Sequence, residues 1–396
     1  MIDQGPRSSP VPALHSWLMD VAHVDDDGAT FMRALADRLL AAGIPLWRVS
    51  YALMTMHPEV LWRTVQWRAG ESVVVRDQPH ARIDDAFYTK SPVAVARREP
   101  GPIRVRLVEG ALPYPICEDL RALGGTDYYV QGLPFASGQV SYVSFATTAA
   151  EGFSAEALAE LEALRPFLAR RLELESSYYA TRALLDVYLG KNAARRVLAG
   201  AFQRGKGELI DAAIWFSDMR DFTALSDRTA PAQVVETLDM YFDAVASAVS
   251  ARGGEVLKFI GDAVLAVFPL GDDARRACRS ALGAAAEAFA ALERLNQDRA
   301  ARGEEAIAIG VALHRGQVMY GNIGARDRLD FTVISAAVNE ASRLEALCKQ
   351  LGTPLALSEA FATTAEADDV VDLGAHSLKG VKAPLRVFTQ RRWQRG

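Results

Sequence analysis

The first half of the chain alternates between helical and strand-like spacing of apolar residues. Residues 31–42 have apolar side chains at helical spacing, and Gly43 follows them directly. This pattern predicts a helix that ends at the glycine. Four β-prone runs are predicted to form two pairs of neighbouring strands, 47–56 with 60–67 and 128–135 with 139–147.

Helical spacing returns after these strands and continues to about residue 200. Ser154 is a suitable N-cap for the first of these turns. Residues 170–205 are expected to form a helical connector that is interrupted near Gly190. The connector has a stripe of apolar side chains, which consists of Leu172, Tyr179, Leu184 and Tyr188. Such a stripe fits a helix packed on its own domain, or a signalling helix that pairs with a second subunit, which we favour.

Strands and helices alternate again from residue 210 onward. Residues 212–216 predict a short buried strand, which ends at Ser217 and Asp218. A helix is expected to begin near Pro231, because proline suits the first helical turn. A β-hairpin is predicted next, with strands at 255–260 and 263–268 around a turn at Gly261 and Asp262.

Two residues of this half have chemistry that the pattern alone leaves open. Asp218 is well placed to hold a divalent ion, although strand-end aspartates are usually caps or turn residues. Strand alternation places Lys258 on the face of Val256 and Ile260, where its ammonium group needs an acceptor. The alternative is that Lys258 reaches solvent at the rim of the sheet.

Length, composition and charge fit a globular protein of two domains. The chain has 396 residues, which is too long for one compact core, and half of them are apolar. A formal net charge of -5 provides no basic field for a phosphate backbone, so nucleic acid is not an expected partner. The three cysteines, Cys117, Cys278 and Cys348, lie far apart without a CxxC pair, which favours a reducing compartment.

The first 24 residues are expected to be a loose segment. They lack the charged start and apolar core of a signal peptide. No stretch of the chain approaches the roughly 20 apolar residues that a membrane span needs. We therefore expect a cytoplasmic protein without a membrane span.

The order of elements over residues 25–169 resembles a GAF domain, a common sensor of small molecules or proteins. The resemblance implies an α/β sensor domain that responds to an unknown small-molecule or protein signal. His57 and His80 are isolated and form no haem or metal signature. No ligand is assigned to this domain.

Three strings in the second half resemble the class III adenylyl and guanylyl cyclases. They are FSDMRDFT at 216–223, KFIGDAVLAVF at 258–268 and FTVISAAVNEASRLEA at 331–346. The resemblance implies an α+β protein with a ferredoxin-like βαββαβ catalytic domain over residues 206–396. It also implies ATP as the substrate, cyclic AMP and pyrophosphate as the products, and two divalent ions, Mg²⁺ or Mn²⁺, as cofactors.

The resemblance further assigns roles to residues at the family's motif positions. Asp218 and Asp262 match the aspartates that bind the two metal ions. Lys258 and Thr332 match the pair that reads the base. A lysine donor and a threonine acceptor suit adenine N1 and the exocyclic amine, so adenine is favoured over guanine.

The remaining assigned positions concern the ribose and the phosphates. Asn339 matches the ribose-orienting asparagine and Arg343 the arginine that stabilises the transition state. Their i, i+4 spacing places both on one face of a helix. Lys379 matches a phosphate-contacting lysine, with Lys382 close by, and the turn at Phe222 and Thr223 is expected to bind phosphate through its backbone.

The sequence departs from the family pattern at two places. Asp221 stands where a glycine is common, and Ser335-Ala336-Ala337 replaces the usual Gly-Asp-Thr. Asp221 adds negative charge near the phosphate-binding turn, where it either weakens nucleotide affinity or points outward. These departures predict a slower or weaker-binding enzyme rather than a different reaction.

The resemblance also implies that two chains are needed. In the family, the metal aspartates and the nucleotide-reading residues lie on opposite faces of one domain, so a head-to-tail homodimer forms two shared sites. Two alternatives stay open: a guanylyl cyclase, and a catalytically silent module that binds nucleotide or a partner protein.

Overall fold

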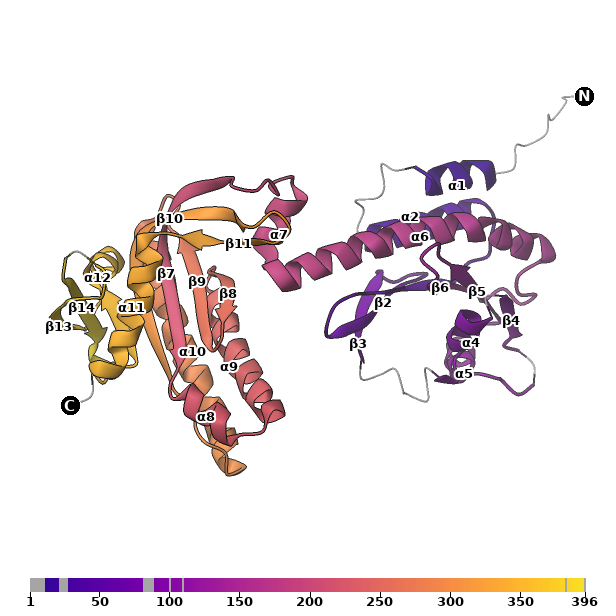
Figure 1. Ribbon diagram of the computed structural model, residues 1–396. Helices are drawn as coiled ribbons and strands as arrows, with labels where there is room; N and C mark the ends of the chain where they lie inside the picture. Colours follow the sequence, from indigo (N-terminus) through magenta and orange to yellow (C-terminus); the bar gives the residue numbers. More distant parts are fainter. Residues whose placement is uncertain are drawn as a thin grey trace, which may run out of the picture. The chain divides into compact units, whose positions relative to one another are not determined.

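The chain folds into two compact units, Met1–Val187 and Tyr188–Gly396, which are described separately (Figure 1). Both combine helices with β-sheet, so the predicted α+β class is confirmed. The computed structural model describes residues 11–20, 28–80, 89–99, 101–108, 110–381 and 383–394.

A six-stranded antiparallel sheet forms the centre of the N-terminal unit, in the order β3-β2-β1-β6-β5-β4. Both predicted strand pairs are confirmed, as β1 with β2 and β5 with β6. The sequence did not indicate β3 or β4, whose prolines and charged residues weaken the strand signal. The strands are β1 (Arg48–Met54), β2 (Val60–Arg68), β3 (Val74–Pro79), β4 (Pro102–Arg106), β5 (Asp127–Pro134) and β6 (Val140–Thr147).

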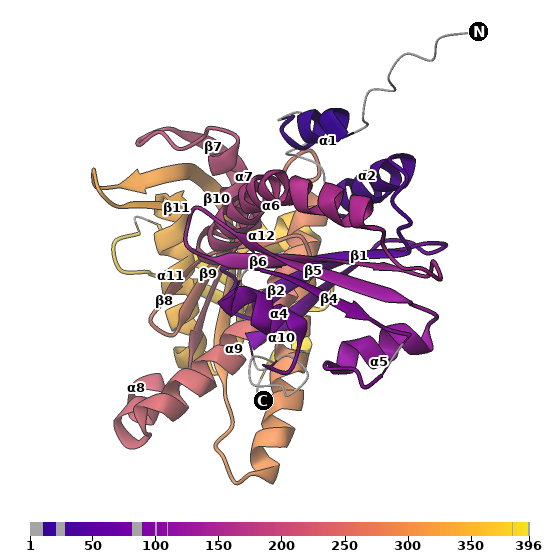
Figure 2. The same ribbon diagram turned by 90° about the vertical axis from the view of Figure 1, so that its right-hand side faces the viewer.

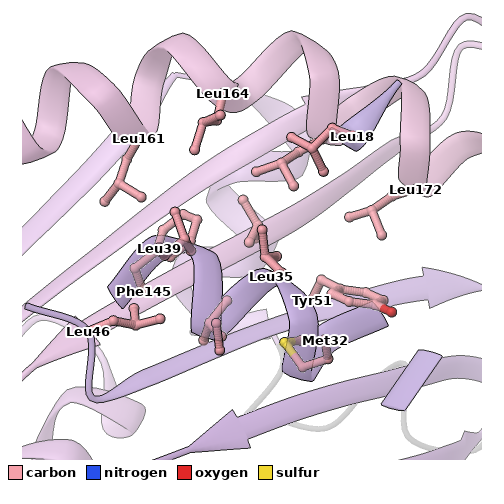
Figure 3. Close-up of a cluster of buried hydrophobic side chains, with 14 of the residues drawn as sticks. Leu18, Met32, Leu35, Leu39, Leu46, Tyr51, Phe145, Leu161, Leu164 and Leu172 are labelled. Carbon is pink, nitrogen blue, oxygen red and sulfur yellow. The ribbon is translucent and has the colours of Figure 1, made fainter. Parts of the chain in front are cut away.

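One face of this sheet carries the main hydrophobic core of the unit, beneath three helices. The three helices are α1 (Val11–Leu18), α2 (Gly28–Ala41) and α6 (Ala155–Leu189). Figure 3 shows Leu35 and Leu39 of helix α2 facing Leu161 and Leu164 of helix α6. The predicted helix over 31–42 is therefore confirmed, and it is held by apolar packing rather than by its own length.

Helix α1 corrects the expectation that residues 1–24 form a loose segment. Leu14, Trp17 and Leu18 are buried in the core described above. The ring of Trp17 stacks on that of Phe31 in α2, with 5.4 Å between the ring centroids. Apolar residues on one side of a short helix are enough to fix it to the domain, although the surrounding Pro and Ser suggested a loop. Residues 1–10 and 21–27 lie outside the described part of the chain.

Two short helices cover the opposite face of the sheet, α4 (Pro92–Arg98) and α5 (Pro115–Ala122). Figure 2 shows both on the side of the sheet away from α1 and α2. Cys117 and Leu120 of α5 pack with Val130 and Ala146 of the sheet. The resemblance of this unit to a GAF domain stays a prediction.

The predicted interruption of the connector near Gly190 is confirmed. Helix α6 runs without a break to Leu189, and Gly190 then takes a positive φ of 83° before α7 (Lys191–Leu198) begins. The apolar stripe of the connector divides into two parts. Leu172 is buried and Tyr179 packs at the edge of the N-terminal core, whereas Tyr188 is 80% exposed.

The C-terminal unit is built on a sheet in the order β13-β14-β12-β10-β7-β9-β8, with β11 paired to β10. Apart from α7 and the short helix α8 (Phe222–Arg228), its first elements follow the order β7, α9, β8, β9, α10, β10, which confirms the predicted βαββαβ arrangement. The strands are β7 (Gly207–Met219), β8 (Glu255–Ile260), β9 (Ala263–Pro269), β10 (Ile309–Gly324), β11 (Leu329–Ile334), β12 (Leu355–Ser358), β13 (Val370–His376) and β14 (Leu385–Gln390).

Helices cover both faces of this second sheet. Trp215 of β7 is buried among residues of α9, α10 and α12 on one face. Ile214, the next residue along β7, contacts α7 and α11 on the other face. The helices are α8 (Phe222–Arg228), α9 (Pro231–Ala251), α10 (Ala274–Ala301), α11 (Ala336–Gln350) and α12 (Glu359–Ala365).

The cysteines and the long helices have the following properties. Cys117, Cys278 and Cys348 are unpaired and buried, and burial raises the pKa of each thiol. Across the described residues, none of the helices combines the length and the apolar character that crossing a bilayer requires.

Candidate active site

Asp218 and Asp262 meet at one end of the C-terminal sheet. Asp218 on β7 follows Ser217, which pairs with Val264 of β9. Asp262 lies in the two-residue turn between β8 and β9, where Gly261 takes the positive φ of 63° that such a tight turn favours. This antiparallel register brings the two carboxyl groups within hydrogen-bonding distance of each other.

The protonation of Asp218 reflects this crowding. Burial, then the hydrogen bond and charge of Asp262, and then the charge of Glu345 raise the pKa of Asp218 to about 7. The Oδ1 atom of Asp218 is buried and has no hydrogen-bond partner among the described residues. A buried acceptor beside a second carboxylate is an arrangement that a positive charge would stabilise.

A buried ion pair that the sequence analysis missed lies beside Asp218. Arg220 Nη1 lies 3.0 Å from Glu345 Oε1, and their side chains are 19% and 5% exposed. Gly310 of β10 pairs with Asp218 in the sheet, and a Cβ at Gly310 would lie 1.7 Å from Arg220 Nη2. The absence of a side chain at Gly310 therefore makes room for the ion pair, and Glu345 neutralises Arg220 next to the two aspartates.

Hydrogen bonds between buried side chains join the end of β7 to helix α9. The Ser217 hydroxyl accepts a hydrogen bond of 3.0 Å from Trp215 Nε1 and lies 3.0 Å from the Tyr241 hydroxyl of α9. All three residues are buried. These contacts tie the strand that carries Asp218 to the helix beneath it.

The departure at Asp221 has a structural explanation. Asp221 has a left-handed backbone with φ of 55°, which explains why glycine suits this position, and aspartate tolerates it better than most residues. Its exposed carboxylate lies 2.8 Å from Lys349 Nζ of α11, and this contact lowers the pKa of Asp221. Helix α8 follows directly, with Phe222 packed on the core and Thr223 exposed. The extra negative charge is thus partly balanced within the chain.

Lys258 has the acceptor that the sequence analysis required, but not on the expected face. A β-bulge between Val256 and Lys258 inserts Leu257 into β8, so simple alternation fails and Lys258 is exposed rather than placed among apolar side chains. Lys258 Nζ lies 2.5 Å from Asp330 Oδ2 of β11, in an ion pair whose two side chains are 42% and 45% exposed. Thr332 is buried two residues further along β11, on the same side of the strand as Asp330.

Asn339 and Arg343 lie one turn apart on α11, as their spacing predicted. Asn339 is exposed, and Arg343 is half-buried against the loop after β13, where a Cβ at Gly380 would lie 3.2 Å from Arg343 Nη1. Lys379 precedes this glycine and is exposed. Lys382 lies outside the described residues. The structure thus brings Arg343 and the Lys379 loop together.

Helix geometry separates these residues from the aspartates. Glu345 and Arg343 are two positions apart on α11, which corresponds to about 200° around the helix axis. Glu345 is directed toward Arg220 and Asp218, whereas Arg343 is directed toward Gly380. Within one chain, the side of α11 that carries Arg343 therefore faces away from the carboxylate pair.

Asp330 and the Arg220–Glu345 pair are the site residues that the sequence analysis missed. A signal for Asp330 was present, because it lies two positions before Thr332 on a predicted strand and so shares its face. Glu345 stands between apolar residues of an amphipathic helix, which is unusual for an unpaired charge. Its partner Arg220 is 125 positions earlier, and no local pattern connects the two.

The carboxylate pair fits a divalent ion by its chemistry. Carboxylate oxygens are the ligands that Mg²⁺ and Mn²⁺ prefer, and the unpartnered Oδ1 of Asp218 provides a free acceptor. The part of the chain that the structure describes contains no cluster of three or more Asp, Glu, His or Cys side chains arranged for a metal. Asp218 and Asp262 have the donor chemistry to hold an ion here, which further ligands would have to complete.

Comparison with known proteins relates the C-terminal unit to one protein family. Residues 207–388 match the family model of the adenylate and guanylate cyclase catalytic domain. The chain is similar to an adenylate cyclase of Anabaena cylindrica, with 37% identity over 150 residues, covering 37% of this chain and 29% of that protein. It is also similar to adenylate cyclase 1 of Rhizobium meliloti, with 32% identity over 210 residues, covering 51% of this chain and 31% of the relative. The chain thus spans less than a third of the length of these relatives.

Among solved structures, the fold is similar to that of a bacterial light-regulated adenylyl cyclase. The TM-score is 0.50 at 21% sequence identity, and the match covers 70% of this chain and 89% of that one. At this identity the similarity concerns the fold alone.

Proposed function

We propose that the chain converts ATP to 3′,5′-cyclic AMP and pyrophosphate, because residues 207–388 match the family model of the adenylate and guanylate cyclase catalytic domain. The observation that carries the proposal is the pair of adjacent carboxyl groups of Asp218 and Asp262 at the end of β7. Two carboxylates forced together without a positive side chain between them are suited to bind divalent cations beside a triphosphate.

The proposed reaction is an intramolecular displacement. The ribose 3′-oxygen forms a bond to the α-phosphorus as the bond from that phosphorus to the β-phosphate oxygen breaks. The hydroxyl proton is released and pyrophosphate leaves. No covalent bond to the protein is needed, so positioning and charge stabilisation provide the catalysis.

Asp218 and Asp262 would hold two ions, Mg²⁺ or Mn²⁺. When bound, such ions lower the pKa of the 3′-hydroxyl and neutralise charge on the triphosphate. The Arg220–Glu345 pair keeps an arginine beside the aspartates, and Glu345 balances its charge through the contact with Nη1. The backbone at Phe222 and Thr223, at the start of α8, would face the phosphate oxygens.

Lys258 and Thr332 would select adenine. Lys258 would donate to the N1 atom of the base, and the Thr332 hydroxyl would accept from the exocyclic amine. Asp330 holds the Lys258 ammonium at the surface of β8, so the donor is already oriented when the base arrives. Guanine presents a donor and an acceptor in the opposite order, which leaves both polar groups unpaired.

Asn339, Arg343 and Lys379 would act on the ribose and the phosphates. Asn339 would orient the ribose so that its 3′-oxygen is in line with the α-phosphorus. Arg343 offers a planar fork of donors for the charge that grows on the α-phosphoryl oxygens. Lys379, in the loop that contacts Arg343, would bind the triphosphate as a point charge.

We infer that each site is shared between two chains in a head-to-tail homodimer. The support is the geometry of α11, on which Arg343 points away from the side that faces Asp218. One chain would then supply Asp218 and Asp262, and its partner the base-reading and phosphate-reading residues. Closed two-fold symmetry would give two equivalent sites.

The N-terminal unit would govern this reaction through α6. A small rotation between two chains displaces the metal side of a site from its nucleotide side, and the reaction depends on positioning. Inserting one alanine after the exposed Arg182 turns the rest of the helix by about 100°. We expect a severalfold change in turnover, whereas unchanged turnover would show that the helix transmits nothing.

The direct test is to incubate the purified chain with ATP or GTP and with Mg²⁺ or Mn²⁺, and to resolve the products by chromatography. Cyclic AMP from ATP is expected. Cyclic GMP as the main product would identify a guanylate cyclase, and tight ATP binding without any cyclic product would identify a silent module.

The shared site has its own test. Chains with Asp218→Ala and chains with Arg343→Ala should each be inactive alone, and mixing them should restore activity, because a mixed dimer rebuilds one intact site. Two chains with the same substitution serve as the control. Absence of rescue, with mixed dimers demonstrated by affinity tags, would exclude the shared arrangement.

A further inference from the structure

The face of the N-terminal sheet that α4 and α5 cover is part apolar and part polar. Along β1, Val49, Tyr51 and Leu53 face the hydrophobic core beneath α2 and α6. The alternate positions Arg48 and Ser50 face the other way, toward the side that α4 and α5 cover. A face covered by helices is normally apolar, since it forms part of a core. Solvent exposure therefore does not explain why polar residues lie on this covered face.

A cavity of about 720 Å³ lies between this polar face and the two helices. Its size is within the range of sites for small organic molecules. Its floor comes from residues of β1, β2, β5 and β6, its edge from β3 with the exposed Arg76, and its far side from α4 and α5. The residues that matter for binding are Arg48, Ser50, Trp62, Gln66, Tyr128 and Tyr142.

Ser50 provides the first sign of a missing ligand. Its side chain is 1% exposed and lines the cavity, yet Oγ has no hydrogen-bond partner among the described residues. Buried hydroxyl groups are almost always paired, because an unpaired one loses its hydrogen bonds to water without replacement. A polar atom of a bound molecule would provide the partner.

Arg48 provides the second sign. Its guanidinium group donates to Gln66 Oε1 at 2.6 Å and to Ser144 Oγ at 3.4 Å, both neutral acceptors. None of the carboxylates in the described ranges forms an ion pair with it. Of the two lining aspartates, Asp77 accepts hydrogen bonds of 2.8 Å from Nε and Nη2 of Arg63, and Asp119 is exposed on α5. The base of the cavity therefore holds a positive charge that the described residues leave uncompensated.

Aromatic side chains give the cavity its other property. Trp62 and Tyr128 are buried and line the cavity, and Tyr142 is half-buried beside them. Rings of this kind offer flat apolar surface that suits a planar ligand. The base of the cavity offers a positive charge and hydroxyl groups, and its walls offer aromatic rings. A molecule with an anionic group attached to a flat ring would fit both.

We propose that this cavity binds a small organic anion with an aromatic or conjugated ring. The anionic group lies against Arg48 and accepts a hydrogen bond from Ser50 Oγ, and the ring packs against Trp62, Tyr128 and Tyr142. The binding does not depend on the cyclase reaction proposed above, and it is measured without nucleotide. Failure of either proposal therefore leaves the other unaffected.

The test uses the full chain and a pair of probes that differ in charge. Binding of 2-naphthoate and of the neutral 2-naphthalenemethanol is measured by isothermal titration calorimetry. We expect naphthoate to bind at least tenfold more tightly than the alcohol. Absence of naphthoate binding at 10 mM, or equal binding of the two probes, would overturn the proposal.

Three variants locate the binding. Ser50→Ala should weaken naphthoate binding about threefold or more while the melting temperature without ligand stays the same or rises, because the lost hydroxyl has no partner. Arg48→Gln should weaken binding at least tenfold, and Arg33→Gln, at an exposed arginine outside the cavity, should leave it unchanged. If Ser50→Ala binds as tightly as the wild type, the assignment of this cavity is wrong, whether or not Arg48→Gln folds.

Discussion

Replacing Asp218 by asparagine should stabilise the metal-free protein while abolishing its activity. The carboxyl group of Asp218 has a pKa of about 7 instead of its ordinary 3.8, because it is partly buried beside Asp262 and Glu345. At ~1.36 kcal/mol per pH unit, this interval corresponds to at most about 4 kcal/mol of destabilisation when the group is ionised. The side chain is only partly buried, so screening by solvent reduces this to about 1–2 kcal/mol. For a unit of this size the melting temperature should rise by roughly 3–6 °C.

The effect has a defined direction with pH. In the unfolded chain the carboxyl group ionises near pH 3.8, whereas in the folded chain it stays protonated up to about pH 7. Between these values the unfolded state binds fewer protons than the folded state, so stability falls as pH rises. Above pH 7 both states are ionised and the loss is complete. The advantage of Asp218→Asn should therefore be absent near pH 4 and largest above pH 7.

The assay is thermal unfolding in EDTA at pH 4.5 and at pH 8, followed by circular dichroism. Asp227→Asn, which removes an exposed carboxylate from α8, is the matched control and should change the melting temperature little. Added Mn²⁺ should raise the melting temperature of the wild type more than that of Asp218→Asn. If the variant is less stable at pH 8, or if its advantage is the same at both pH values, Asp218 is an ordinary structural residue and the reasoning is refuted.

Three further substitutions test other contacts of the site. Lys258→Ala should lower the ratio of kcat/KM for ATP to that for GTP about tenfold, since a lost hydrogen bond to a base edge is worth roughly 1–3 kcal/mol; an unchanged ratio would remove the lysine from base selection. Glu345→Gln leaves Arg220 without its charged partner and should reduce the free energy of unfolding, measured in urea, by about 3 kcal/mol. The control is Glu287→Gln, which breaks an exposed ion pair and should reduce the free energy of unfolding by less than about 1 kcal/mol. Lys349→Met leaves the charge of Asp221 unbalanced and should raise the KM for ATP about threefold with little change in kcat, an effect that 0.5 M salt should diminish.

Features fixed by neighbouring residues could be predicted from the sequence. The hairpin around Gly261 and Asp262 and the helix break at Gly190 both follow from glycine at a position that needs positive φ. The pairing of β1 with β2 follows from two β-prone runs close together in the chain. In each of these cases the local preference and the final structure agree.

Features that depend on distant residues could not be predicted in the same way. The bulge at Leu257 shifts Lys258 to the exposed side of β8, and alternation alone gave the wrong face. The ion pair of Arg220 with Glu345 needs space that exists only because Gly310 is opposite Asp218. Such contacts join three separate segments, and their geometry appears only when the sheet and α11 are assembled.

Helix α11 connects the two halves of the proposed shared site, and this has a consequence for mixed dimers. On one side Glu345 holds Arg220 beside Asp218, and on the other side Arg343 packs against the Gly380 loop. In a head-to-tail dimer, α11 of one chain would then support the metal side of one site and supply the arginine of the other. A change at Glu345 that displaces α11 should affect both sites, whereas loss of Asp218 affects only its own.

Mixed dimers with the wild type separate these cases. A dimer with one Asp218→Ala chain should keep about half of the wild-type turnover, because one site stays intact. A dimer with one Glu345→Gln chain should fall clearly below half, measured on dimers isolated through two different affinity tags. Turnover of half or more with Glu345→Gln would mean that α11 supports the two sites independently, and that the buried pair serves only the fold of its own domain.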